Sequence, residues 1–161
     1  MPLLLLLAPA LAVQAAPAPA PTFDAIAFFT GRTEGVGRLK IAMRAARPLA
    51  VHGTGTVAPD GTLVLTQTVE QAGAPPRRRA WRIRAVAPGR YAGTLTDAVG
   101  PVVGETHGNR LRLAYRMKRG LAAEQWLTLA PDGRSAANVL TVRKFGVVVG
   151  RLTETITRTG G

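Results

Sequence analysis

Apolar and polar side chains alternate with a period of two through most of this chain, from about Arg32 onward. Segment 110–118 is the clearest case. Its even-numbered positions are mostly cationic, and its odd-numbered positions are apolar, namely Leu111, Leu113, Tyr115 and Met117. Because a β-strand places successive side chains on opposite faces, the pattern predicts strands with one apolar face and one hydrated, cationic face.

Turn signals separate these alternating segments at short, regular intervals. Pro-Asp-Gly occurs at 59–61 and 131–133, Pro-Gly at 88–89 and Gly-Asn at 108–109. Proline fixes one φ angle of a turn, and glycine or asparagine accepts a positive φ, so each of these motifs predicts a tight hairpin. The predicted strands are 36–44, 49–57, 62–71, 79–86, 90–97, 102–107, 110–118, 124–129, 135–144 and 147–157.

The fold class follows from this order of elements. Successive short strands with no helical crossover between them favour an up-and-down antiparallel sheet, and closing that sheet removes its unpaired edges. We therefore predict an all-β chain with a single antiparallel β-barrel of about eight to ten strands. A β-sandwich is the alternative.

The N-terminal region predicts export. Residues 1–15 combine a run of leucines with small residues that fit a signal peptidase site, and the run is too short for a membrane-spanning helix. Residues 16–22 are rich in alanine and proline, which alternate from Ala16 to Pro21, and are expected to form an extended spacer. The barrel domain is then 23–161, opening with a short helical turn for which Thr22 is the expected N-cap and Asp24 a first-turn residue.

Composition narrows the class of protein further. The 161 residues are 47% apolar, which favours a folded chain over a disordered one. They include no cysteine, so the sequence offers neither a disulfide nor a thiol for lipid attachment. Together with the signal peptide, this predicts a periplasmic or secreted protein that is soluble after cleavage.

The formal net charge is +12, and it comes mainly from arginine. Such a charge favours contact with an anionic membrane surface. The alternative is compositional, because a GC-rich genome enriches arginine without a functional reason. Nucleic acid is not an expected partner, since export separates the protein from it and the basic residues are not interleaved with exposed aromatic residues.

Candidate reaction chemistry is sparse. The two histidines, His52 and His107, lie far apart in the sequence, so no metal site or other cofactor is predicted. Ser135 is the only serine and has no nucleophile-elbow context. Glycine-rich segment 31–37 lacks the lysine and helix that a phosphate loop requires.

Three titratable residues remain as weak catalytic candidates. Asp97 and Glu105 lie on neighbouring predicted strands, and His107 has the i, i+2 spacing that would place it beside Glu105. If these residues met inside the barrel, they could act as an acid and a base. If they face outward, they pair with nearby arginines.

Segment Arg77–Arg79 follows two prolines and is expected to be a solvated loop.

Several short motifs occur in a characteristic order. They are Phe28-Phe29-x-Gly31, Gly35-x-Gly37, Arg79-x-Trp81, Tyr91-x-Gly93, Asp97-x-Val99-Gly100, Gly104-Glu105, Gly108-Asn109, Tyr115, Asn138, Lys144-Phe145-Gly146 and Gly150. This succession, from about Phe23 to Arg158, resembles the bacterial family named domain of unknown function 3833. The resemblance implies a lipocalin-like (calycin) barrel and a small apolar ligand, and it supplies no catalytic residues.

These observations predict an exported lipocalin-like protein that binds a lipid or another small apolar molecule. The side chains expected to face the ligand are Trp81, Ile83, Leu111, Leu113, Tyr115 and Trp126. Two alternatives remain: a filled barrel that acts through its cationic surface, and a lipid-modifying enzyme. The sequence leaves the oligomeric state open.

Overall fold

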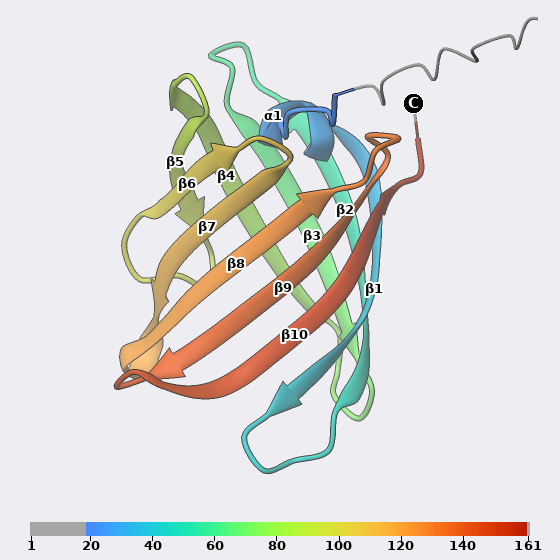
Figure 1. Ribbon diagram of the computed structural model, residues 1–161. Coiled ribbons are helices and arrows are strands. Elements are labelled where there is room, and N and C mark those ends of the chain that lie inside the picture. The colour runs from blue at the N-terminus through green and yellow to red at the C-terminus, as the bar shows by residue number, and fades with distance from the viewer. Residues whose placement is uncertain (1–18, 161) are drawn as a thin grey trace, which may run out of the picture.

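The computed structural model describes residues 19–160, and in this part of the chain ten strands close into one antiparallel barrel (Figure 1). Each strand pairs with its sequence neighbour, and β1 pairs with β10 to close the sheet. The strands are β1 (Gly31–Ile41), β2 (Arg47–Val57), β3 (Leu63–Gln71), β4 (Arg77–Ala87), β5 (Arg90–Leu95), β6 (Val102–His107), β7 (Arg110–Met117), β8 (Leu121–Leu129), β9 (Ser135–Lys144) and β10 (Val147–Arg158).

The predicted all-β, up-and-down barrel is confirmed, and differences are confined to element bounds. The largest difference is at β1, which begins at Gly31 instead of residue 36 because its first residues pair with the end of β10. Segment Arg77–Arg79, predicted as a loop, is the start of β4 and pairs with residues 67–69 of β3. That pairing continues the ladder to the end of the sheet, so the three arginines alternate between its faces.

Helix α1 (Ala25–Phe29) closes one end of the barrel, as Figure 1 shows. Its N-cap is Asp24 instead of the predicted Thr22, because the Asp24 carboxylate accepts hydrogen bonds from the Ile26 and Ala27 amides at 2.9 and 3.1 Å. Phe23 and Phe28 pack against each other with tilted rings, whose centroids are 5.1 Å apart, and both are buried. No helix in the described part of the chain is both long and apolar enough to cross a membrane. The predicted signal peptide lies outside the described residues.

The opposite end of the barrel, here named the open end, has no such cover. It is formed by five connections, at residues 42–46, 72–76, 96–101, 118–120 and 145–146. Successive strands run alternately toward and away from this end, because each pair of consecutive strands is joined by a hairpin. Any molecule that enters the interior along the barrel axis therefore has to pass these hairpins.

The inward-facing side chains form two apolar clusters. The larger cluster lies beneath α1 and includes Phe28, Leu63, Trp81 and Leu111. The smaller cluster lies nearer the open end and consists of Leu49, Val51, Val69 and Leu152. Buried polar side chains accompany them, namely Thr33, Thr62, Gln67, Gln125, Asn138, Thr141 and Glu154. The interior is thus layered instead of uniformly apolar.

Gly93 permits the close approach of β5 to β4. A Cβ atom at this position would lie 1.8 Å from the carbonyl oxygen of Arg82. We predict that Gly93→Ala lowers the free energy of unfolding by about 1–3 kcal/mol, because the strands must separate locally. Chemical denaturation checks this. The control is Gly150→Ala, whose Cβ would meet its nearest neighbour at 3.6 Å and should not destabilise the barrel.

Candidate functional site

The half of the interior beneath α1 is almost filled. A cavity of about 30 Å³ remains there, comparable with the space that one water molecule occupies. Four of the six predicted ligand-facing residues line it, namely Trp81, Ile83, Leu111 and Leu113. All four are buried, with inward-facing side chains, and they form part of the larger apolar cluster.

A larger cavity, here named the open-end cavity, occupies the other half of the barrel. Its volume is about 240 Å³, slightly below the lower limit of roughly 300 Å³ for pockets that hold a small molecule. Tyr115 is the predicted ligand-facing residue that lines it. Its walls are mostly aliphatic and include Leu39, Leu49, Val69, Leu140, Val142 and Leu152.

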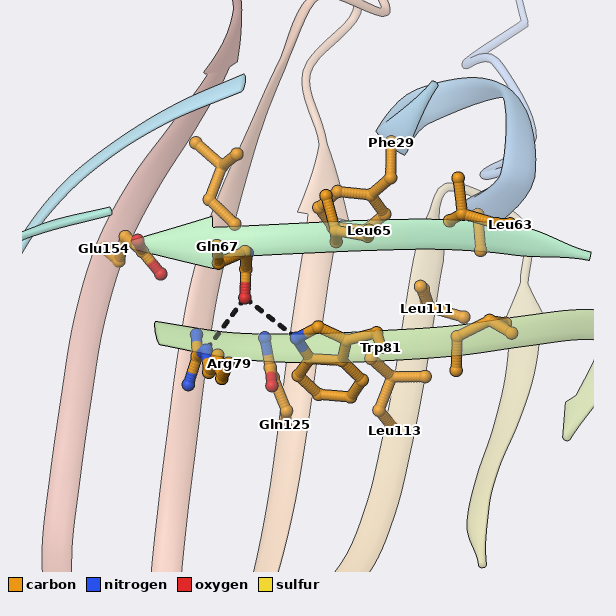
Figure 2. Close-up of a pocket in the computed structure, with 13 residues that line it drawn as sticks. Phe29, Leu63, Leu65, Gln67, Arg79, Trp81, Leu111, Leu113, Gln125 and Glu154 are labelled. Carbon is orange, nitrogen blue, oxygen red and sulfur yellow. Dashed lines mark hydrogen bonds between the residues drawn. The ribbon is translucent and has the colours of Figure 1, made fainter. Parts of the chain in front are cut away.

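Arg79 lies between the two cavities and lines both of them. Its Nε donates a hydrogen bond of 2.8 Å to Oε1 of Gln67, and the indole Nε1 of Trp81 donates to the same oxygen at 2.8 Å (Figure 2). The guanidinium also lies over the Trp81 ring, 5.8 Å from its centroid. These contacts hold a cation at the inner end of the open-end cavity, and no carboxylate in the described part of the chain forms an ion pair with it.

Glu154 and Asn138 add a second buried polar pair on β10 and β9. Asn138 Nδ2 donates a hydrogen bond of 2.9 Å to Glu154 Oε2, while Oε1 of Glu154 and Oδ1 of Asn138 are buried without a partner. Gly35 makes room for this carboxyl group, because a Cβ there would lie 1.9 Å from Oε1. Burial raises the pKa of Glu154, against smaller opposing effects of the Asn138 hydrogen bond and the Arg79 charge.

The rim of the open-end cavity carries the charged pair Arg77 and Asp97. Arg77 Nη1 lies 3.9 Å from Asp97 Oδ2, and both residues line the cavity. Tyr115 lies deeper, edge-on to Trp81 with ring centroids 5.7 Å apart. Burial raises the pKa of the Tyr115 hydroxyl, so the group remains a neutral hydrogen-bonding group at physiological pH. The cavity thus combines aliphatic walls, a phenol and an inner guanidinium.

The weak catalytic candidates are not brought together inside the barrel. Asp97 lies at the rim of the open-end cavity, whereas Glu105 lies on the outer surface. Glu105 is 4.0 Å from Arg90 and 3.6 Å from His107, which is the outward-facing ion-pair arrangement that the sequence left open. Within residues 19–160 there is no group of three or more His, Asp or Glu side chains that could hold a metal ion.

Trp126 does not face the interior, contrary to the prediction. The inward positions of β8 are Ala123, Gln125, Leu127 and Leu129, so alternation places Trp126 outside. There Arg110 stacks on its ring, 4.4 Å from the centroid, and the His107 ring lies 6.2 Å away. Trp126 therefore lines neither interior cavity.

Sequence reasoning missed the polar members of the interior, namely Gln67, Arg79, Gln125, Asn138 and Glu154. The periodicity did contain a signal for several of them, because Gln67 continues the inward series Leu63 and Leu65, and Arg79 precedes Trp81 and Ile83 by the same step of two. The signal is easily overlooked, since charged residues such as the half-buried Arg79 and the buried Glu154 rarely face a barrel interior.

The sequence of residues 4–158 matches a family model described as "Protein of unknown function (DUF3833)". No curated protein matches the chain. The sequence is thus related to a family whose description assigns it no function.

Solved structures share the fold at low sequence identity. One is a protein of unknown function from the DUF3598 family of Nostoc punctiforme PCC 73102, with a TM-score of 0.67, 13% identity and coverage of 89% of this chain. This chain spans about half of that protein, 52%. The S-type phycobiliprotein lyase CPES from Guillardia theta has a TM-score of 0.64, 6% identity and coverage of 84% and 91% of the two chains. Rv2717c from M. tuberculosis has a TM-score of 0.64, 16% identity and coverage of 84% and 96%.

The raised pKa of Glu154 predicts a specific dependence of stability on pH. Because the folded protein holds this proton more tightly than the unfolded chain, the contribution of Glu154 is fully present below the ordinary pKa of 4.5 and is lost as pH rises through the raised value. We predict that Glu154→Gln reduces this loss, so that the variant gains stability relative to the wild type as pH rises. Thermal unfolding over a pH series measures it. Glu70→Gln, on the exposed face of β3, is the control and should follow the wild type.

Proposed function

We propose that this chain, which belongs to the DUF3833 family of proteins of unknown function, binds one small lipid-like molecule in its open-end cavity. The proposed ligand has an aliphatic body and an anionic group. The body lies among the aliphatic walls, and the anionic group lies next to Arg79.

The observation that carries this proposal is the division of the interior into a filled half and an unfilled half. The cavity of about 240 Å³ lies at the end that α1 leaves uncovered, and its walls are mainly leucine and valine. An apolar cavity is poorly hydrated, so an aliphatic chain that enters it leaves water and gains about 0.8 kcal/mol per buried CH₂ group. An open mouth allows such a ligand to enter and leave without unfolding of the barrel.

The position of Arg79 favours an anionic group on the ligand. A guanidinium has five N–H donors, and the guanidinium of Arg79 donates one of its hydrogen bonds to Gln67. A carboxylate or phosphate accepts two parallel hydrogen bonds from such a group. Burial disfavours the charged form of the nearby Glu154, so that residue competes weakly with a ligand anion.

The cell envelope is the proposed location, on the basis of the predicted signal peptide. A protein of this kind would hold a lipid precursor or degradation product in the aqueous space between membranes. The similar structures support the barrel fold alone, because their identities are 6–16%. The name of one of them, a lyase, shows that a barrel of this shape also serves an enzyme.

Native mass spectrometry tests whether a ligand is present. Protein purified from a bacterial periplasm without detergent should carry an added mass that extracts into organic solvent. A protein that is ligand-free, and remains so after incubation with envelope lipids, would contradict the proposal and favour a barrel that acts through its surface. Turnover of an added lipid would instead favour the enzyme.

A cavity-filling variant tests the location of the ligand. Leu39 lines the open-end cavity, and Val36 on the same strand points outward with 70% of its surface exposed. We predict that Leu39→Trp abolishes the added mass, because the indole occupies the space of the aliphatic chain. Val36→Trp introduces the same side chain outside and should retain it. Equal retention by both variants would place the ligand elsewhere.

The role of Arg79 is tested with decanoic acid and decanol, which share a chain and differ in charge. We predict that Arg79→Gln weakens decanoic acid binding by about tenfold or more, since a hydrogen bond to a charged group contributes roughly 1.5–3 kcal/mol. Decanol binding should change little. Arg78→Gln, at the neighbouring exposed position, is the control. Titration calorimetry measures both ligands, and an equal loss for acid and alcohol would argue against an anion site.

A further inference from the structure

We propose that the open end of the barrel docks on the surface of an anionic lipid bilayer. The contact consists of an apolar rim, defined as Ile41, Met43, Phe145, Val147 and Val148, and of the basic residues around it. The inference rests on exposure, backbone strain and charge at this end. It does not require that the cavity holds a ligand.

The apolar rim contains the two most exposed large hydrophobic side chains of the described chain. Met43 is 100% exposed and Phe145 is 89% exposed. They lie on the β1–β2 and β9–β10 connections, which are neighbours because Ile41 pairs with Gly150. The Ala42 amide also donates a hydrogen bond of 2.8 Å to the Val149 carbonyl. The exposed apolar side chains of the rim therefore lie on neighbouring strands at one end of the barrel, and a gathering of such side chains marks an interaction site.

Backbone strain supports a role for Phe145 beyond folding. Phe145 and Gly146 form the two-residue turn between the paired residues Lys144 and Val147, and their φ angles are +50° and +81°. Asparagine or glycine is the usual first residue of such a turn, because a bulky side chain with positive φ is strained by about 1–2 kcal/mol. Here the strained position holds a phenylalanine that contacts little of its own protein. Such outliers concentrate at functional sites.

Two further residues other than glycine have a positive φ angle at the same end of the barrel. Among described residues other than glycine, positive φ occurs at Ala42, Arg119 and Phe145, and all three lie in connections at the open end. Ala42 directly precedes Met43, and Arg119 lies in the β7–β8 connection. The turns at the α1 end use glycine for their positive φ angles, at Gly61, Gly89, Gly108 and Gly133. Within residues 19–160, positive φ angles at residues other than glycine thus occur only at the end with the apolar rim.

Charge identifies an anionic partner. The five connections of the open end, taken with two residues on either side of each, contain two acidic residues, Glu70 and Asp97. Their basic residues, here named the mouth cations, are Lys40, Arg44, Arg47, Arg77, Arg78, Arg116, Lys118, Arg119, Arg143 and Lys144. Each cation close to an anionic bilayer contributes about 1 kcal/mol to binding. By contrast, the α1 end carries Asp24, Asp60 and Asp132 among its arginines.

This charge also argues against a second copy of the chain as the partner of the rim. Two open ends facing each other would bring two sets of mouth cations together across a small apolar contact, and like charges repel. A bilayer surface satisfies both features at once, because phosphate groups neutralise the cations while methionine, phenylalanine and valine enter the interfacial region.

Docking in this orientation would place the mouth of the open-end cavity against the lipid. If the cavity binds a lipid-like molecule, as proposed above, that molecule could pass between bilayer and barrel without crossing water. This last step depends on the proposed function, whereas the docking surface itself does not.

Sedimentation with vesicles tests the docking surface. The purified protein should bind vesicles of phosphatidylglycerol and phosphatidylcholine, bind pure phosphatidylcholine at least about tenfold more weakly, and dissociate as salt rises. Phe145→Asn combined with Met43→Ser should weaken binding by about tenfold or more. Val57→Ser combined with Val86→Ser, at exposed sites near the α1 end, is the control and should leave binding unchanged.

Phe145→Asn gives a second readout that separates function from folding. Asparagine tolerates positive φ better than phenylalanine, so this variant should unfold at a higher temperature while it binds vesicles less well. A lower unfolding temperature would show that Phe145 stabilises the fold and would overturn its assignment to the docking surface.

Charge reversal tests the orientation. Arg44→Glu with Arg119→Glu removes positive charge from the open end, and Arg32→Glu with Arg134→Glu removes the same charge from the α1 end. We expect about a hundredfold loss or more for the first pair and a much smaller loss for the second. Equal losses would mean that the net charge acts without a docking face and would overturn the inference.

The outcomes for the two proposals are distinguishable. Vesicle binding is measured without added ligand, and ligand binding is measured without vesicles. Failure of the ligand experiments with intact, rim-dependent vesicle binding would contradict only the proposed function. Absence of vesicle binding with an occupied cavity would overturn only the docking surface.

Discussion

Pairing of the first strand with the last is the interaction on which the rest of the structure depends. β1 and β10 pair continuously from Thr33 with Arg158 to Ile41 with Gly150, so the sheet has no unpaired edge. Closure also sets the interior width. About eight strands enclose a space that side chains just fill, and this barrel has ten. The wider interior must be plugged, hydrated or occupied by a ligand.

The chain meets this requirement differently at its two ends. At one end, Phe23 and the two phenylalanines of α1 fill the barrel together with Trp81 and its aliphatic neighbours. At the other end, the described residues form hairpin connections, one of them a three-residue 3₁₀ turn at Lys118–Gly120, and the open-end cavity remains. Arg79 and Gln67 mark the boundary between the two regions. Arg79 is half-buried, so part of its hydration is lost, and this cost is offset when an anionic group binds next to it.

Features of the open end that reduce stability occur together. A strained phenylalanine and a concentration of basic residues disfavour the isolated folded protein, and a fully exposed methionine buries no apolar surface in it. A surface that supplies apolar contact and negative charge covers the methionine and neutralises the basic residues. Glu154 is a different case, because its buried carboxyl group lies in the interior and depends on the space left by Gly35.

The sequence by itself determined the strand order, the hairpin turns and the two-faced character of each strand, because these depend on a period of two and on local turn chemistry. It also placed Trp81, Ile83, Leu111, Leu113 and Tyr115 correctly on the inner face. The same alternation contained a signal that Arg79 faces inward and Trp126 outward, which the tertiary structure made plain. Only the tertiary structure decided that Asp97 and Glu105 lie in separate surroundings. Alternation assigns residues to one of two faces within a strand, but closure and register decide which strands face each other across the barrel and which end remains open.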